Sequence, residues 1–333
     1  MKRFLALVVG FCLLVAPCSF FCAATEDCDE NPDEASYIKW VDFGVSAKAL
    51  ADTAAADIAL HESDRPLSWI EMLAYLAARY GGKFASYQKA DLTAYLEKRK
   101  TETPETLVKN RKLYDYYYEA YEAILSGLLG PYWLETLDEA GHAHLERQYG
   151  VKAFHPIARG YSFSEYDDFG NARNYGYRRN HLGHDMMGSV GTPIIAVESG
   201  VVEALGWNRF GGWRVGIRSF DGKRYYYYAH MRKGHPYADM YEGKVVSAGE
   251  VIGYLGMTGY SSKKDVNNIN VPHLHIGLQL IFNPKQKEGV NQVWVDFLPL
   301  SSFLSKYRNK AYQKPDGSDF TAKTRVIDLN MPD

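Results

Sequence analysis

The chain has 333 residues, of which 46% are hydrophobic and 23% charged, so it is long and apolar enough for two domains with cores of their own. Its formal net charge is −2, and it therefore lacks the basic excess that nucleic-acid-binding proteins usually carry. We expect a folded protein whose partners do not include nucleic acid.

The N-terminal residues resemble an export signal. Lys2 and Arg3 precede an apolar run at residues 4–21, and small residues up to Ala24 precede an acidic stretch. This arrangement is typical of a signal peptide, here residues 1–24, and it predicts an extracytoplasmic protein that is secreted or associated with the cell envelope. Because a run of about 18 residues is close to the minimum for a spanning helix, an uncleaved membrane anchor through residues 4–21 is the alternative.

All four cysteines lie within the first 28 residues. A lipid anchor on Cys18 or Cys22 is a weaker alternative, because Pro17 and Phe21 stand where small residues should precede the cysteine. After residue 24 only Cys28 remains, so no intrachain disulfide is expected in the exported chain. Metal ligands further along the chain are limited to His, Asp and Glu.

Residues 25–150 are expected to form a helical region. Ser68 and Glu71 have the spacing of a capping box, and apolar residues recur at helical spacing after them. Gly81 and Gly82 supply the C-terminal stop. The pattern therefore predicts a helix from about residue 69 to residue 80.

Two further helices are expected before residue 135. One carries Leu92, Tyr95 and Leu96. The other begins at Thr103–Pro104, buries apolar residues as far as Leu125 and ends near Gly127 to Pro131. No pattern in this region carries chemistry, so a structural or regulatory role is expected. Binding of a partner or of the cell wall is the alternative.

After about residue 150 the hydrophobic period changes from 3.6 toward 2, which indicates β-strands. Alternating residues 213–218 and the run Tyr225–Tyr228 flank Asp221–Gly222, a strong hairpin signal. Further strands are expected at 192–197, from 201 after a turn at 198–200, at 251–255 and at 273–282. The predicted fold class is α+β, with an antiparallel β-sheet domain at residues 151–300 and a polar C-terminal extension at 301–333.

The first chemistry-bearing pattern is Pro272-His273-Leu274-His275. Residues two apart on a strand share a face, so His273 and His275 should point the same way, with apolar neighbours on the opposite face. Two adjacent imidazoles favour a bound metal ion, because their nitrogen atoms need partners. Two solvated histidines on an exposed face are the simpler alternative.

The second pattern is His181-Leu182-Gly183-His184-Asp185. Zinc prefers imidazole nitrogen and carboxylate oxygen, and a catalytic site uses three protein ligands with one open position. His181 and Asp185 would supply two of the three. Alone this spacing is weak, because surface loops often contain both residue types.

Tyr228-Ala229-His230 is the third pattern and ends the second strand of the hairpin. In this order, the three patterns resemble the lysostaphin/LytM-type zinc metallopeptidases over roughly residues 155–282. The resemblance also includes the following positions: Phe169-Gly170 with Arg173, Gly191-Thr192-Pro193, Gly200, Gly249, Ile252-Gly253 and Gly256-x-Thr258-Gly259.

The resemblance implies a duplicated-hybrid-motif, or LytM-like, domain that binds one zinc ion through His181, Asp185 and His275. It also implies that His230 and His273 are catalytic histidines beside that ion. Two neutral imidazoles and one carboxylate would leave a charge of about +1, enough to lower the pKa of a bound water from 15.7 toward about 7. His273 would lie near the metal, as a general base or oxyanion donor must, and its division of roles with His230 stays open.

Three features depart from the family pattern. His184 stands where an aliphatic residue is usual, and strand alternation should turn it away from Asp185, so we do not expect it to be a ligand. The segment Tyr260–Val271 is longer than usual and should border the cleft. The run Tyr225–Tyr228 is unusually aromatic, and at least one alternate pair should be buried.

The resemblance implies a zinc-dependent metalloendopeptidase that hydrolyses peptide bonds in bacterial peptidoglycan, with peptidoglycan peptide as its partner. The alternatives are a non-catalytic relative that binds cell wall or activates an amidase, and a metal-dependent hydrolase of other peptides. Retention of all five key positions favours hydrolysis, because degenerate relatives lose ligands. The sequence does not indicate which bond is cut or the oligomeric state.

Overall fold

The computed structural model describes residues 41–331, apart from 139, 175–177 and 288–290. The expected signal peptide and membrane anchor lie outside the described residues. Within the described ranges, none of the helices has the length and apolar character needed to cross a membrane. The described residues all belong to one compact unit, residues 37–333.

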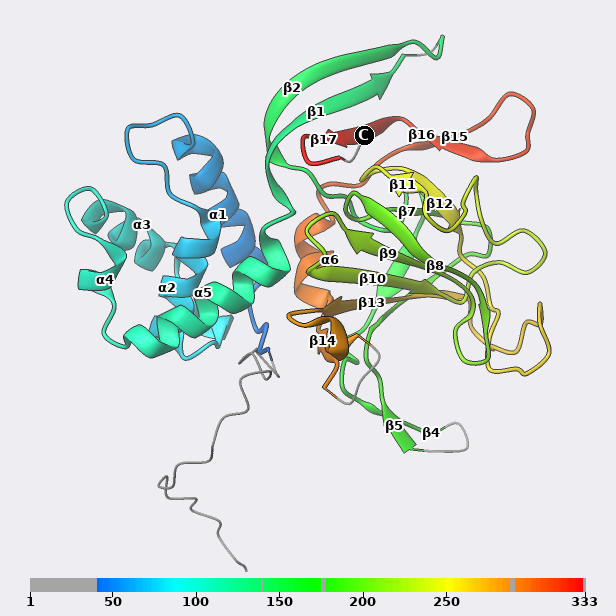
Figure 1. Cartoon of the computed structure of the whole chain (residues 1–333), viewed down its shortest axis with the longest axis horizontal. Helices are drawn as coiled ribbons and strands as arrows, with labels where there is room; N and C mark the ends of the chain where they lie inside the picture. The colour runs from blue at the N-terminus through cyan, green and yellow to red at the C-terminus, as the bar shows by residue number, and fades with distance from the viewer. Residues whose placement is uncertain (1–40, 139, 175–177, 288–290, 332–333) are drawn as a thin grey trace, which may run out of the picture. The chain divides into compact units, whose positions relative to one another are not determined.

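The N-terminal part of this unit is helical, as predicted (Figure 1). Its elements are α1 (Ala47–Leu60), α2 (Trp69–Tyr80), the 3-10 turn η1 (Phe84–Ser86), α3 (Lys89–Lys98), α4 (Pro104–Leu107) and α5 (Arg111–Leu125). The predicted bounds of α2 are confirmed, because the Ser68 side chain caps its N-terminus and Gly81 ends it in the left-handed conformation.

Two details of the helical prediction are wrong. Glu71 does not complete a capping box, since its Oε1 accepts hydrogen bonds from Tyr95 and Arg99 of the neighbouring segment instead. The helix predicted to run from Thr103 to about Gly127–Pro131 is broken into α4 and α5, and α5 ends at Leu125. Val108 is extended after α4, and the Asn110 side chain accepts from the backbone N–H of Leu113 to cap a new helix.

The rest of the unit is built of antiparallel strands, which confirms the α+β fold class. The bounds are β1 (Leu129–Leu137), β2 (Ala143–Val151), β3 (Phe163–Glu165), β4 (Ala172–Asn174), β5 (Arg178–Asn180), β6 (His184–Gly188), β7 (Pro193–Ile195), β8 (Gly200–Asn208), β9 (Gly212–Ser219), β10 (Arg224–Ala229), β11 (Val245–Val246), β12 (Val251–Tyr254), β13 (His273–Leu280), β14 (Val293–Val295), β15 (Ala311–Gln313), β16 (Phe320–Ala322) and β17 (Thr324–Asp328). The 3-10 turn η2 (Pro284–Gln286) and helix α6 (Leu298–Leu304) complete the fold.

One large sheet carries the residues expected to do chemistry. Its strands lie in the order β11-β8-β9-β10-β13-β6-β3, and β14 also pairs with β13. The hairpin predicted around Asp221–Gly222 joins β9 to β10. Strand β13 lies between β10 and β6, with Ala229 opposite His275 and His275 opposite Asp185. The register alone therefore brings three distant chain segments to one point.

Residues 129–151 correct the expectation that all of residues 25–150 are helical. They form β1 and β2, which continue into a three-stranded sheet with β17 from the C-terminal extension. Tyr132 on β1 pairs with Asp328 on β17. The segments before and after the expected 151–300 domain therefore share one sheet.

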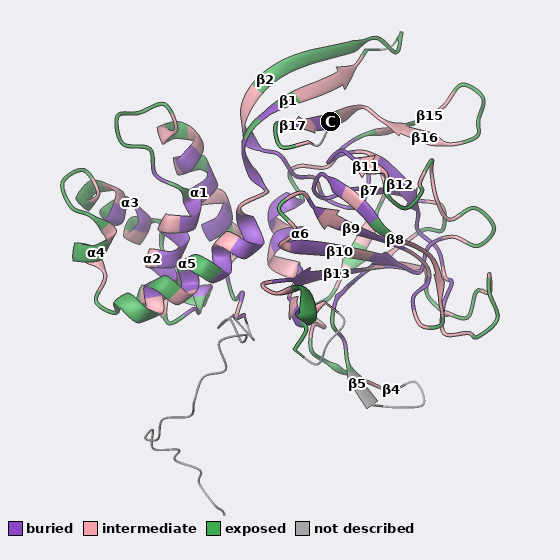
Figure 2. Cartoon of the chain, in the orientation of Figure 1, coloured by how far each residue is buried: buried purple, intermediate pink, exposed green. Residues whose placement is uncertain are grey.

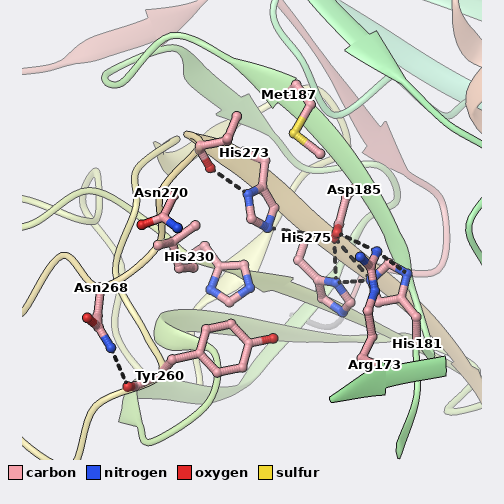
Figure 3. Close-up of a pocket in the computed structure, with 12 residues that line it drawn as sticks. Arg173, His181, Asp185, Met187, His230, Tyr260, Asn268, Asn270, His273 and His275 are labelled. Carbon is pink, nitrogen blue, oxygen red and sulfur yellow. Dashed lines mark hydrogen bonds and ion pairs between the residues drawn. The ribbon is translucent and has the colours of Figure 1, made fainter. Parts of the chain in front are cut away.

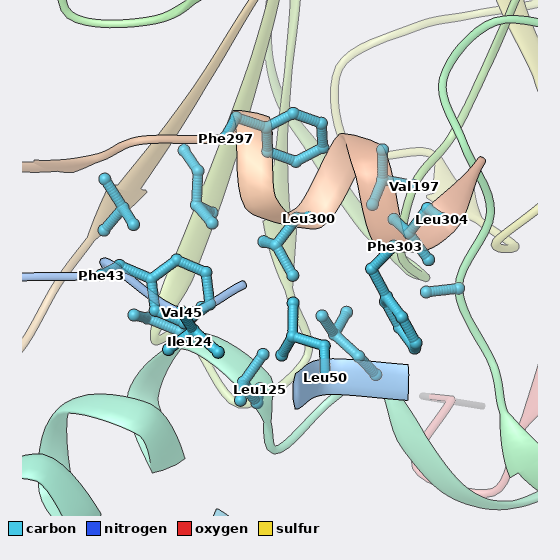
Figure 4. Packing of buried hydrophobic residues seen from close by; sticks show 14 of the residues in the cluster. Phe43, Val45, Leu50, Ile124, Leu125, Val197, Phe297, Leu300, Phe303 and Leu304 are labelled. Atoms are coloured by element: carbon cyan, nitrogen blue, oxygen red, sulfur yellow. The ribbon is translucent and has the colours of Figure 1, made fainter. Parts of the chain in front are cut away.

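A single cluster of buried apolar side chains runs from the helices into the large sheet. Figure 2 shows buried residues along α1, α2, α5 and α6 as well as on the central strands. Helix α6 lies between the two parts: Figure 4 shows its Leu300 directed toward Leu50 of α1. The ring centroids of Phe303 and Trp69 are 5.9 Å apart. The helical part is thus packed into the core of the β-sheet part.

Arg224 adds a buried polar connection between the same two parts. It lies at the start of β10 and is 1% exposed. Its Nε and Nη2 donate to both carboxylate oxygens of Glu198, at 2.8 and 3.0 Å, and its Nη1 donates to the carbonyl of Ala123 in α5 at 2.7 Å. Tyr226 also donates to Glu198. Burial opposes the charge of Arg224, but the Glu198 carboxylate outweighs it and raises the pKa of the guanidinium.

Candidate metal centre

His181, Asp185 and His275 converge on one point of the large sheet (Figure 3). Asp185 is on β6, His275 is opposite it on β13, and His181 lies just before β6. His181 Nε2 is 3.1 Å from Asp185 Oδ1 and 3.0 Å from His275 Nδ1. His275 Nδ1 is 2.9 Å from the same carboxylate oxygen.

This donor set fits a divalent cation. Each residue offers one ligand atom, and the three atoms lie within 4.8 Å of one another. Two imidazole nitrogens and one carboxylate oxygen are the ligands that zinc prefers in proteins. The set has three members, which is the number that a catalytic zinc site uses when one position is open.

Asp185 supplies the negative charge of the set. Burial would raise the pKa of its carboxyl, but the contacts with the ring nitrogens of His181 and His275 outweigh burial, and the pKa lies well below its ordinary value. Burial lowers the pKa of His275, against the opposing effect of Asp185. The centre therefore contains an ionised carboxylate beside a neutral imidazole.

His230 and His273 lie beside this group, as the resemblance implied. His230 follows β10 with a positive φ of 63°, and its Nδ1 donates to the Thr258 carbonyl at 2.8 Å. Nδ1 of His273 donates to the Val271 carbonyl, also at 2.8 Å. Because a carbonyl only accepts, each Nδ1 carries the ring proton, and a neutral ring leaves a lone pair on Nε2.

The Nε2 atom of His273 points toward the ligand group, 3.8 Å from Asp185 Oδ1. The rings of His230 and His273 are 4.8 Å apart, and the His230 ring is 5.8 Å from that of His275. Burial, followed by the nearby His273 and His275, lowers the pKa of His230 well below its ordinary value. His230 is therefore neutral at neutral pH and can accept a proton at Nε2.

A cavity of about 230 Å³ opens over the centre (Figure 3). All five predicted site residues line it, together with residues of the long Tyr260–Val271 segment, as expected. The contributing residues of that segment are Tyr260, Asn268, Ile269, Asn270 and Val271. Tyr260 stacks on His230, with ring centroids 5.7 Å apart.

Comparison with known proteins identifies the domain that holds this centre. Residues 179–291 match the sequence profile of the family described as "Peptidase family M23". Residues 179–291 of the chain therefore match an M23 peptidase domain. The resemblance to lysostaphin/LytM-type peptidases is thereby confirmed.

Two curated relatives and one solved structure show where the similarity lies. The L-Ala--D-Glu endopeptidase of Bacillus subtilis (strain 168) is 40% identical over 126 residues, covering 37% of this chain and 36% of the relative. Glycyl-glycine endopeptidase ALE-1 of Staphylococcus capitis is 30% identical over 164 residues, covering 44% and 40%. The chain thus spans less than half the length of these relatives. A crystal structure of a putative glycyl-glycine endopeptidase lytM from Ruminococcus gnavus ATCC 29149 aligns over 80% of this chain and 91% of its own, with a TM-score of 0.49 and 23% identity.

His184 does not belong to the centre of the M23 domain. It is fully buried and directed away from Asp185, with its Nε2 2.9 Å from Glu165 Oε2. Ser301 of α6 donates to the same carboxylate oxygen. Tyr226 and Tyr228 are the buried pair of the aromatic run, as alternation predicted.

Sequence reasoning missed one residue that contacts the centre and left another without a role. Asp168 lies 3.2 Å from His181 Nδ1, and Arg173 lies 3.2 Å from Asp185 Oδ2. Arg173 entered the resemblance only as a matching position, and Asp168 was not singled out. The signal available was their spacing before His181, but a short run of polar residues in a loop has no periodicity that could reveal a contact.

Gly183 explains why the pattern around His181 contains a glycine. A Cβ at this position would lie 2.5 Å from His275 Nε2 and 2.4 Å from its Cε1. Gly183→Ala should therefore displace His275 and weaken metal binding by about tenfold or more, which is about 1.4 kcal/mol. The measurement is zinc affinity in competition with a chromophoric chelator. Gly150→Ala on β2, where a Cβ meets only Ile58 at 3.8 Å, is the control. Unchanged affinity in Gly183→Ala would contradict this account.

Proposed function

We propose that the protein is a zinc-dependent endopeptidase that hydrolyses peptide bonds in bacterial peptidoglycan. The observation that carries the proposal is the convergence of His181, Asp185 and His275 beside His230 and His273 in an M23 domain. The named activities of the two curated relatives, on L-Ala–D-Glu and glycyl-glycine bonds, support a peptide substrate. Peptidoglycan as the source of that peptide follows from the lysostaphin/LytM resemblance.

One zinc ion would be held by His181 Nε2, Asp185 Oδ1 and His275 Nδ1. When bound, it would supply Lewis acidity toward a water molecule and the scissile carbonyl. The histidines that line the cavity without belonging to the ligand set are His230 and His273, and their Nε2 atoms are the ring nitrogens not bound to a backbone carbonyl. Both are lone-pair atoms while the rings are neutral, because the Thr258 and Val271 carbonyls hold the protons on Nδ1.

Each histidine can therefore accept the proton that an attacking water must lose. Once protonated, the same Nε2 can donate to the amine that leaves or to the developing oxyanion. Burial keeps His230 neutral before the reaction, so it begins as an acceptor. The Tyr260–Val271 segment forms a wall of the cavity and would contact the peptide.

The cell envelope is the proposed site of action, since the substrate lies there and the N-terminal sequence resembles an export signal. Residues 151–300 would form the catalytic domain, and residues 25–150 a structural or regulatory region. The main competing function is a non-catalytic relative that binds cell wall or activates an amidase. The intact set of five histidine and aspartate side chains favours catalysis over such a non-catalytic function.

Incubation of the purified protein with peptidoglycan tests the proposal. Mass analysis should find soluble fragments with new peptide ends, and a chelator should abolish their release until zinc is restored. His273→Ala should lose release while binding one zinc per chain, because it faces the centre without being a ligand. Fragment release by the chelated protein would contradict the metal role, and full activity in His273→Ala would remove that residue from the mechanism.

A further inference from the structure

Asp168 contacts the proposed metal ligand His181 without belonging to the ligand set. Nδ1 of His181 lies 3.2 Å from the Asp168 backbone carbonyl and 3.2 Å from its Oδ2. Both oxygens can only accept, and they lie closer to Nδ1 than the donor Arg173 Nη2 does at 3.4 Å, so Nδ1 carries the ring proton. The lone pair is then on Nε2, which faces Asp185 and His275.

Arg173 determines which oxygen atoms of the Asp168 and Asp185 carboxylates remain available to other partners. Its Nη2 donates to Oδ2 of Asp168 and to Oδ2 of Asp185, the latter at 3.2 Å. Asp185 is thereby left with Oδ1 directed at the ring nitrogens of His181 and His275. Figure 3 shows the Arg173 side chain beside His181 and Asp185. Asp168 Oδ2, shared between Arg173 and His181, is occupied and is not among the atoms that converge on the centre.

The backbone holds Asp168 in register with His181. The backbone N–H of Gly170 donates to the carbonyl of His181 at 2.7 Å, and the N–H of His181 donates to the carbonyl of Asn171 at 2.9 Å. Gly170 has a φ of 75°, which a residue with a side chain rarely adopts. The turn therefore returns Asp168 to the Nδ1 side of the His181 ring.

The Asp168 carboxylate is costly to bury. Its side chain is 14% exposed, and within the described residues its Oδ1 has no hydrogen-bond partner. Leaving such an atom unpaired away from water is unfavourable. Among the residues that the structure describes, the contacts of the carboxylate with Arg173 and His181 offset this cost, which indicates a role for those contacts.

We propose that Asp168 is a positioning residue of the metal centre. Its carboxylate orients the His181 ring and keeps Nε2 as the lone-pair atom that faces the cation, and Arg173 keeps Asp168 itself out of the ligand set. This inference rests on the proposed function, since it concerns the ligand role of His181. Carboxylates that accept from a metal-bound histidine typically change metal affinity by about 10–100-fold when they are replaced.

Metal binding by the full chain tests this role without relying on activity. Zinc is removed, and its affinity is measured again in competition with a chromophoric chelator. Asp168→Ala should lower zinc affinity about 10–100-fold, and Asp168→Asn should lower it less, because an amide oxygen still accepts from His181. The visible spectrum of the cobalt-loaded protein should also change in Asp168→Ala, since the His181 ring is no longer fixed. Asp167→Ala, at the exposed neighbouring acid, should change neither quantity.

The outcomes separate the two proposals. If the wild-type protein binds no zinc, the proposed function fails and this inference fails with it. If the wild-type protein binds zinc and Asp168→Ala binds it equally well with the same cobalt spectrum, only the positioning role is overturned. Should Asp168→Ala fail to fold by circular dichroism, Asp168→Asn decides, and wild-type affinity in that variant also overturns the role.

Discussion

Replacement of His275 by alanine should remove both the zinc binding and the peptidase activity proposed for this chain. His275 Nδ1 lies 3.0 Å from His181 Nε2 and 2.9 Å from Asp185 Oδ1, so it supplies one corner of a three-atom donor set. Two remaining ligands cannot hold zinc in the manner of a catalytic site, which uses three. Fragment release from peptidoglycan should fall to the level of the chelated wild-type protein.

Metal content and activity are measured on the same preparation. His144→Ala is the matched control, because this histidine is 69% exposed on β2, outside the ligand group, and should retain both zinc and activity. His273→Ala should differ from His275→Ala by losing activity and retaining zinc. One zinc per chain in His275→Ala would show that the cation is held elsewhere.

Replacement of Arg224 by methionine should cause a large loss of stability. The variant leaves the Glu198 carboxylate buried without its bidentate cation and removes a hydrogen bond to the Ala123 carbonyl of α5. Loss of one partner from a buried ion pair costs about 3–5 kcal/mol. Typical domains are stable by only about 5–15 kcal/mol, so urea unfolding should show a clearly lower midpoint.

Two further variants isolate the cause of this loss. Arg147→Met changes an exposed arginine of β2 and should alter stability by no more than about 0.5 kcal/mol. Combining Arg224→Met with Glu198→Gln should cost less than the sum of the single changes, because the charge left unpaired is then also removed. If the losses of stability in the two single variants simply add up in the double variant, the ion pair between Arg224 and Glu198 contributes little to stability.

The large sheet and its site could be predicted because their signals are local. Alternation in residues 213–218 and 225–228 gave the hairpin, and the two-residue spacing of His273 and His275 placed both on one strand. The convergence of those strands on His181 and Asp185 could not be worked out from local periodicity. That expectation came from the family resemblance, and the pairing of β13 with β6 shows how the fold produces it.

The parts of the fold that were predicted wrongly have physical causes that can be traced to particular residues. Most of β2 is exposed, and Arg147 interrupts the apolar alternation of residues 143, 145, 149 and 151. The strand pairs with β1, which in turn pairs with the distant β17. Glu71 fitted a capping box by spacing but found partners in Tyr95 and Arg99, which only tertiary structure brings near. Asn110 caps α5 within a stretch whose apolar periodicity seemed continuous.

The limits of the family match differ from the limits of the hydrophobic core. The family match covers residues 179–291, yet β3 at the edge of the same sheet and α6, which packs in the same core, lie outside those limits. Leu300 and Phe303 of α6 are buried in one cluster with Leu50 and Trp69. A fragment limited to residues 179–291 would lack these helices, and the hydrophobic side chains that they cover would be exposed to solvent. The segment that matches the family is therefore smaller than the part of the chain that shares one hydrophobic core.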